Sequence, residues 1–150
     1  MKLISGYLLA VLVAYVSGAV FVSQGNIAAV SAMGFEITLG QRVDAMVHDV
    51  SNMYDIYLIL IAIGLMIALP VAALIIRSFP DLRRIGYVSA GFITMIAIHV
   101  ILKAVLGLSG IAPTRDVIGL IAQGLSGAMG GLVFHYMTGG GGQHRRKRPE

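Results

Sequence analysis

The sequence contains no cysteine and no tryptophan, and only 12% of its 150 residues are charged. Without cysteine the chain cannot form disulfides, bind zinc or iron–sulfur clusters through thiolates, or use a cysteine nucleophile. Soluble proteins carry roughly 25% charged residues, whereas this chain is 57% hydrophobic with a mean hydropathy of +0.87. The composition therefore predicts an integral membrane protein.

The sequence also lacks the short motifs that mark common enzyme classes. It has no HExxH zinc motif, no phosphate-binding loop and no GxSxG nucleophile elbow. Its apolar stretches contain no pair of carboxylates for acid–base chemistry. We therefore expect a protein that is not an enzyme.

Four uncharged or nearly uncharged runs are long enough to cross a bilayer. A span needs about 20 predominantly apolar residues to cross roughly 30 Å of hydrocarbon. Backbone amides in lipid must bond within their own segment, which favours helices. We predict an all-α membrane domain, residues 1–138, with four spans in a bundle and one amphipathic helix on the outer side. The predicted spans cover about residues 3–22, 56–76, 85–107 and 117–137.

Basic residues fall mainly on one side of this arrangement, and short loops rich in Lys and Arg stay in the cytoplasm. The side of both chain ends collects Lys2, Arg77, Arg83, Arg84, Arg145, Arg146, Lys147 and Arg148. The other side has Arg42, Lys103 and Arg115. We therefore predict a multi-pass protein of a bacterial inner membrane with both termini in the cytoplasm.

The last residues, 139–150, are predicted to form a flexible cytoplasmic tail. The run Gly139–Gly142 lacks the strand, lysine and helix of a phosphate cradle. Beyond it, Arg145, Arg146, Lys147 and Arg148 are each worth roughly 1 kcal/mol against anionic lipid. The net charge of +4 thus indicates topology and the lipid bilayer as partner, not nucleic acid. A docking site for an acidic partner or nucleic acid is the alternative.

The first span has a rival interpretation as a cleaved secretory signal. Val30 and Ala32 form a small-residue cleavage pattern. However, the apolar run from Leu3 exceeds the roughly 7–15 residues of a signal core, and only Lys2 precedes it. We expect an uncleaved span, with a three-span mature protein as the alternative.

An amphipathic helix is predicted at about residues 39–53. Its apolar residues recur at steps of three and four from Leu39 to Met53. Thr38 and Gln41 match a capping box at its start. We expect this helix to lie on the outer surface or cap the bundle, with a lid for a ligand or partner as the alternative.

Small residues form stripes on the first and fourth spans, which is typical of close helix packing in membranes. These predicted packing residues are Gly6, Ala10, Ala14, Gly18, Gly119, Gly127 and Gly131. We expect packing within one chain, with homo-oligomer contact as the alternative. Pro70 interrupts the second span and predicts a kink that only shapes the helix, with a gating role as the alternative.

Lys103 and His99 form the candidate functional site. Lys103 lies near the outer end of the third span, and His99 lies one turn deeper on the same face. Asp55 and Asp116 are candidate ion-pair partners at the same level. Snorkelling of Lys103 and ordinary packing of His99 are the simpler interpretations.

Haem is not expected. Axial histidines must face each other at one depth. By the 1.5 Å helix rise, His99 lies about 21 Å from the inner end of its span, whereas His135 lies about 27 Å from the outer end of the next. We expect no cofactor, and a non-enzymatic accessory, assembly or scaffold subunit of a larger membrane complex. The alternative is a transporter or channel component with a path near His99 and Lys103.

Overall fold

A computed structural model describes residues 1–107, 114 and 116–139, and this part of the chain is helical with no strand. The elements, in chain order, are α1 (Lys2–Ala32), α2 (Leu39–Asn52), the π-helical turn η1 (Tyr54–Leu58), α3 (Ile59–Ile76), the 3₁₀ turn η2 (Pro80–Leu82), α4 (Arg83–Leu106) and α5 (Val117–Gly139). Four of these segments are long and apolar enough to cross a membrane: Lys2–Ala32, Tyr54–Ile76, Pro80–Val105 and Val117–Gly139. The four predicted helices are therefore present.

Helix α1 extends beyond the first predicted span. It continues to Ala32, whereas the span was predicted to end near residue 22. Ser23–Ala32 contains no proline, so no residue breaks the helix there. This extension packs against α2, with Ile27 buried and the Arg42 guanidinium 3.4 Å from Gln24 Oε1. Long-range packing, which the local sequence does not reveal, extends the helix.

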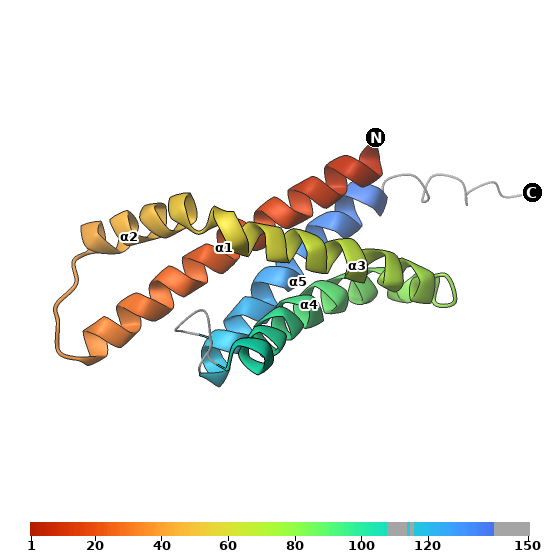
Figure 1. Ribbon diagram of the computed structural model, residues 1–150. Helices are drawn as coiled ribbons and strands as arrows, with labels where there is room; N and C mark the ends of the chain where they lie inside the picture. Colours follow the sequence, from red (N-terminus) through yellow and green to blue (C-terminus); the bar gives the residue numbers. More distant parts are fainter. Residues whose placement is uncertain (108–113, 115, 140–150) are drawn as a thin grey trace, which may run out of the picture.

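Helix α2 begins with the predicted capping box. The backbone N–H of Gln41 donates to Thr38 Oγ1 at 3.3 Å, and the backbone N–H of Thr38 donates to Gln41 Oε1 at 2.9 Å. Two backbone donors at the helix start are thereby satisfied. Helix α2 then ends at Asn52, and η1 connects it to α3. Helices α2 and α3 run in nearly the same direction (Figure 1).

Helix α5 lies between α1 and α4 and makes its most extensive contacts with these two helices. Helix α3 packs on α4 and touches α1 less extensively, while α2 lies along the second half of α1 (Figure 1). Helices α1 and α2 form a two-helix arm that projects past the ends of α4 and α5 in this view. The bundle is thus closed around α5 and more open beside α3.

The small-residue stripes lie inside this bundle. A Cβ placed on Gly127 would overlap the Gly91 carbonyl of α4, and one on Gly131 would overlap the Tyr87 carbonyl. On the other face of α5, a Cβ on Gly130 would meet the Ala10 carbonyl of α1. The whole α1 stripe, Gly6, Ala10, Ala14 and Gly18, is buried. Both faces of α5 therefore approach their neighbours at backbone distance.

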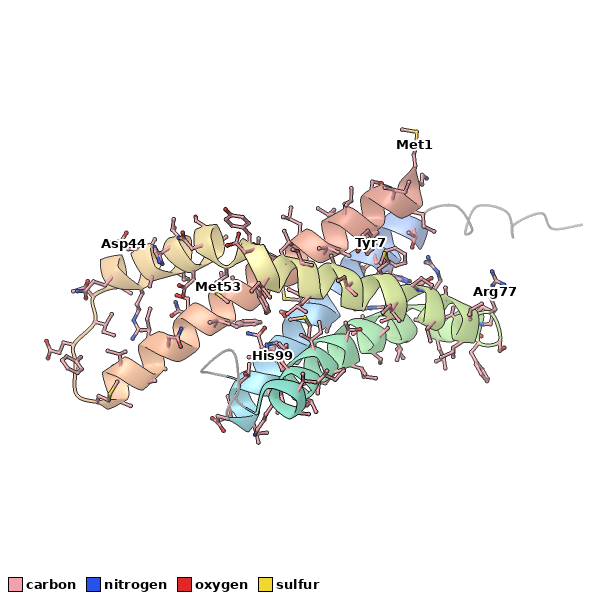
Figure 2. The ribbon with its side chains drawn as sticks, viewed as in Figure 1. Met1, Tyr7, Asp44, Met53, Arg77 and His99 are labelled. Carbon is pink, nitrogen blue, oxygen red and sulfur yellow. The ribbon has the colours of Figure 1, made fainter. Side chains whose placement is uncertain are left out.

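The two ends of the bundle carry opposite charge. Gly6 near the start of α1 lies beside Met137 and Thr138 near the end of α5, and Arg83 contacts Thr138. Among the described residues, this basic end carries Lys2, Arg77, Arg83 and Arg84, with Asp81 as the single acid. The described charged residues of the opposite, acidic end are Glu36, Asp44, Asp49, Asp55 and Asp116 with Arg42 and Lys103. Figure 2 shows Asp44 and Arg77 on opposite sides of the molecule.

Candidate functional site

Four buried side chains form a polar cluster toward the acidic end of the bundle. Tyr15 of α1, Tyr57 of η1, His99 of α4 and Gln123 of α5 have at most 6% of their surface exposed. The Tyr57 ring lies 6.0 Å from the Tyr15 ring and 6.2 Å from the His99 ring, centroid to centroid. The cluster therefore joins four elements through one central tyrosine.

Tyr57 and Gln123 link three of these elements by hydrogen bonds. The Tyr57 hydroxyl donates to Gln123 Oε1, and Gln123 Nε2 donates to the Gly18 carbonyl of α1 at 3.1 Å. A Cβ on Gly18 would overlap the Tyr57 hydroxyl, so only glycine leaves room for this connection. The π-helical turn accommodates one extra residue per turn and so sets the direction of the Tyr57 side chain.

Tyr15 forms a hydrogen bond with the end of α2. Its hydroxyl donates to the Val50 carbonyl, which lies in the last turn of that helix. The last four carbonyls of a helix have no partner within it. Tyr15 therefore satisfies an otherwise free acceptor and ties α2 to α1.

His99 has one nitrogen bonded and one nitrogen free. Nδ1 lies 2.8 Å from the Met95 carbonyl, which can only accept, so Nδ1 carries the proton of the neutral ring. Nε2 is then a bare acceptor, and it is buried with no hydrogen-bond partner in the described part of the chain. This is the arrangement of an imidazole that can accept a hydrogen bond or bind a ligand.

Two more buried polar atoms lack a partner among the described residues. They are Ser23 Oγ, on a side chain that is 1% exposed, and Gln24 Nε2. Both belong to the part of α1 that continues beyond the predicted span. Buried polar atoms are nearly always paired in proteins, so these two atoms and His99 Nε2 are exceptions within the described part of the chain.

The four predicted site residues differ in burial. Lys103, Asp55 and Asp116 are exposed, and no ion pair joins them within the residues that the structure describes. Of the predicted set only His99 is buried, and its neighbours are Met95 and Tyr57. Lys103 lies one turn after His99 on the same stripe of α4, but at that level the helix is no longer covered, and the long Lys103 side chain is exposed.

Tyr57 and Gln123 are functional candidates that the sequence analysis did not single out. The available signal was a lone amide at Gln123 in an otherwise apolar helix, because such a side chain usually bonds to another helix. Its partner lies 66 residues away. No spacing rule connects two residues at that separation.

A second polar group lies at the basic end. Arg83 Nη2 donates to Thr138 Oγ1 at 2.7 Å, Nη1 donates to the His135 carbonyl at 3.3 Å, and the guanidinium carbon lies 5.2 Å from the Tyr87 ring centre. These contacts connect α4 to α5. His135 is therefore at the opposite end of the bundle from the acidic-end cluster that holds His99.

The remaining predicted residues divide by location. Gly119 lies half-buried on α5, and Pro70 lies exposed within the continuous helix α3. The predicted basic tail, Arg145, Arg146, Lys147 and Arg148, lies outside the described residues. Among the residues described, no three His, Asp or Glu side chains could hold a metal ion together.

The chemistry available at the acidic-end cluster is acceptance of a hydrogen bond or proton at His99 Nε2. Ser126, the nearest hydroxyl in sequence to Gln123, already donates to the Gln123 carbonyl at 2.7 Å. Comparison with protein-family models, curated proteins and solved structures finds no match for this chain. The functional conclusions below therefore depend on the residues themselves.

Proposed function

We propose that the chain is a non-enzymatic adaptor subunit of a bacterial inner-membrane complex. The four apolar helices form its membrane anchor, with the basic end in the cytoplasm, as the distribution of Lys and Arg favours. The arm made by α1 and α2 then projects on the outer side and presents a docking surface.

The observation that carries this proposal is an apolar stripe on α2. Leu39, Val43 and Val47 recur every four residues and are 81%, 53% and 61% exposed. Other residues pack this part of the chain against the core, namely Val50 in the last turn of α2 and Met53, the C-cap residue that follows it. Figure 1 shows this helix on the projecting arm. An apolar stripe of this kind on an amphipathic helix fits a groove in a partner protein.

The charges around the stripe favour a protein partner over a lipid surface. Helices that lie on anionic membranes are rich in Lys and Arg on their polar face. Here Asp44, Asp49 and Glu36 accompany only Arg42. The arm is therefore acidic, and an anionic lipid surface would repel it. We propose a partner with an apolar groove rimmed by basic side chains.

The small-residue stripes do not compete for this role. Gly127 and Gly131 lie against α4, and Gly130 and Gly6 lie in the contact between α1 and α5. A homo-oligomer through these stripes would require the bundle to open. Association through α2 requires no such change.

Photocrosslinking in intact membranes tests the adaptor role. A benzophenone side chain at Val43 should form an adduct of one discrete mass with a second protein. The same group at Met46, which is half-buried on α2, serves as the control and should not. With the benzophenone placed at Val47 instead, the additional substitution Val43→Asp should abolish the adduct. Adducts with lipid only, or equal adducts from Val43 and Met46, would contradict the proposal.

A second candidate function is supported by His99 Nε2, which has no hydrogen-bond partner among the described residues. A buried acceptor of this kind fits a step of proton or ligand transfer in a transporter. Proteoliposomes loaded with a pH-sensitive dye would test proton movement. Flux that disappears in His99→Ala and persists in Lys103→Gln would support this candidate over the adaptor, whereas flux equal to that of protein-free vesicles would reject it.

A further inference from the structure

A groove of about 560 Å³ runs along the seam between α3 and α4. Its lining combines small side chains from both helices with isoleucines and Val71. The small residues are Gly64, Ala68, Ala72, Gly86, Ala90 and Ala97. The groove is thus a consequence of two facing rows of short side chains.

The two helices are in contact at two glycines that line the groove. Toward the acidic end, a Cβ on Gly64 would meet the side chains of Thr94 and Ile98. Toward the basic end, a Cβ on Gly86 would meet Ile76. The stretch of α3 that lines the groove, from Gly64 to Ile76, measures about 18 Å by the helical rise. The groove is therefore elongated along the two helices.

The groove lining favours an aliphatic occupant. Its polar side chains are Ser89 and Thr94, and the Thr94 hydroxyl already donates to the Ala90 carbonyl at 2.7 Å. Water in a cavity needs several polar partners, which this lining does not provide. A flexible hydrocarbon chain matches both the shape and the chemistry.

Two arginines lie at the basic end, on either side of the turn that joins α3 to α4. Arg77 is the C-cap residue of α3 (Figure 2), and Arg84 lies in the first turn of α4. Both side chains are exposed, and neither makes a hydrogen bond or ion pair with the described residues. Arg83 differs, because Thr138 and the His135 carbonyl occupy its guanidinium. Asp81 is the only acid in the connecting turn, so the net charge there is positive.

We propose that this groove and these arginines form a binding site for an anionic phospholipid. One acyl chain occupies the seam between α3 and α4, and the phosphate binds Arg77 and Arg84, whose planar donors suit phosphate oxygens. The lipid comes from the leaflet at the basic end. This inference depends on the proposed membrane insertion but is independent of the proposed adaptor role of α2.

Native mass spectrometry of the full chain in detergent tests the site. Phosphatidylglycerol and phosphatidylcholine with identical acyl chains are titrated separately. The wild type should bind one phosphatidylglycerol more tightly than phosphatidylcholine. The double variant Arg77→Gln with Arg84→Gln should lose about 25-fold in phosphatidylglycerol affinity, at roughly fivefold per arginine, and bind phosphatidylcholine as before.

Filling the groove tests the acyl-chain position. Ala68→Leu and Ala90→Leu should weaken both lipids, because the added carbons occupy the seam. The control Ala29→Leu changes an exposed alanine of α1 and should have no effect. Lys2→Gln removes one basic charge from the same end of the bundle and should leave lipid selectivity unchanged.

Three results would overturn the proposal. The first is equal binding of the two lipids by the wild type. The second is a loss of selectivity in Lys2→Gln as large as in the arginine variant. The third is a dimer that persists when lipid is added and dissociates in Ala90→Leu, because a second copy of the chain would then occupy the groove. Circular dichroism verifies that each variant is folded. If a leucine variant unfolds, the arginine double variant still tests the site, because it changes only exposed residues. Carbonate extraction of wild-type membranes tests insertion separately, so a failure of insertion is distinguishable from a failure of this site.

Discussion

Gly91 of α4 and Gly127 of α5 lie against each other so closely that a methyl group on either would overlap the carbonyl oxygen of the other. Their backbones are in direct contact. Such approaches allow dispersion and Cα–H···O contacts between helices, which matter where lipid removes the hydrophobic drive for association. The principal helix contact of the bundle therefore depends on two positions without side chains.

Gly127→Ala should destabilise the protein by about 1–3 kcal/mol, because a backbone carbonyl cannot rotate away from the added methyl group. Thermal unfolding in mild detergent measures the loss. Gly40→Ala is the matched control, since its Cβ would meet only Thr38 Oγ1 at 3.9 Å. Alanine within α2 should be neutral or stabilise by up to about 1 kcal/mol. Equal effects at the two glycines would contradict the assigned packing.

Tyr57→Phe should destabilise by about 0.5–2 kcal/mol, because Gln123 Oε1 loses its donor inside the protein. Gln123→Leu should cost more, since it removes the partners of both Tyr57 and the Gly18 carbonyl. The double variant should lose less than the sum of the two single variants. Tyr136→Phe, at an exposed tyrosine, provides the control. Strict additivity would show that the two side chains do not interact.

His99→Leu should leave stability unchanged or raise it by up to about 1 kcal/mol, because it removes a buried nitrogen that has no partner among the described residues. Thr94→Val provides a contrast, since the Thr94 hydroxyl is already bonded to Ala90. Chemical or thermal unfolding in detergent compares the two variants. A large loss of stability in His99→Leu would indicate that Nε2 has a structural partner and would count against a ligand site.

Arg83→Gln should destabilise by about 1–2 kcal/mol, since the guanidinium connects α4 to Thr138 and the His135 carbonyl of α5. Arg84→Gln removes the same charge from an exposed neighbour and should change stability by less than about 0.5 kcal/mol. The two unfolding midpoints are compared in one detergent. Similar midpoints for the two variants would show that the loss of a positive charge, and not the loss of the Arg83 contacts with α5, determines the change in stability.

Local signals in the sequence were sufficient for the helices and for one cap. The apolar runs predicted four long helices, and Thr38 with Gln41 predicted the start of α2. These features depend on neighbours in the chain. Helix α1 continues about ten residues past the predicted end of the first span, and this extension contacts α2, as in the pair Arg42 and Gln24, which no local pattern predicts.

The candidate site was predictable only in part. The i,i+4 spacing placed His99 and Lys103 on one stripe of the third span, yet one is buried and the other exposed. Periodicity gives the angular position of a residue but not how far the neighbouring helices extend beside it. The link from Tyr57 to Gln123 and Gly18 joins three elements distant in sequence, so no local pattern could identify it.

The sequence alone determined the number of long helices, the cap of α2 and the separation of basic from acidic charge, because each depends on local composition. The tertiary structure decided which helices are neighbours, with α5 between α1 and α4 and an open seam beside α3. The physical reason is that these long helices are apolar around most of their circumference, so hydrophobicity does not indicate which face turns inward. Backbone proximity at glycines and a few buried hydrogen bonds decide that orientation.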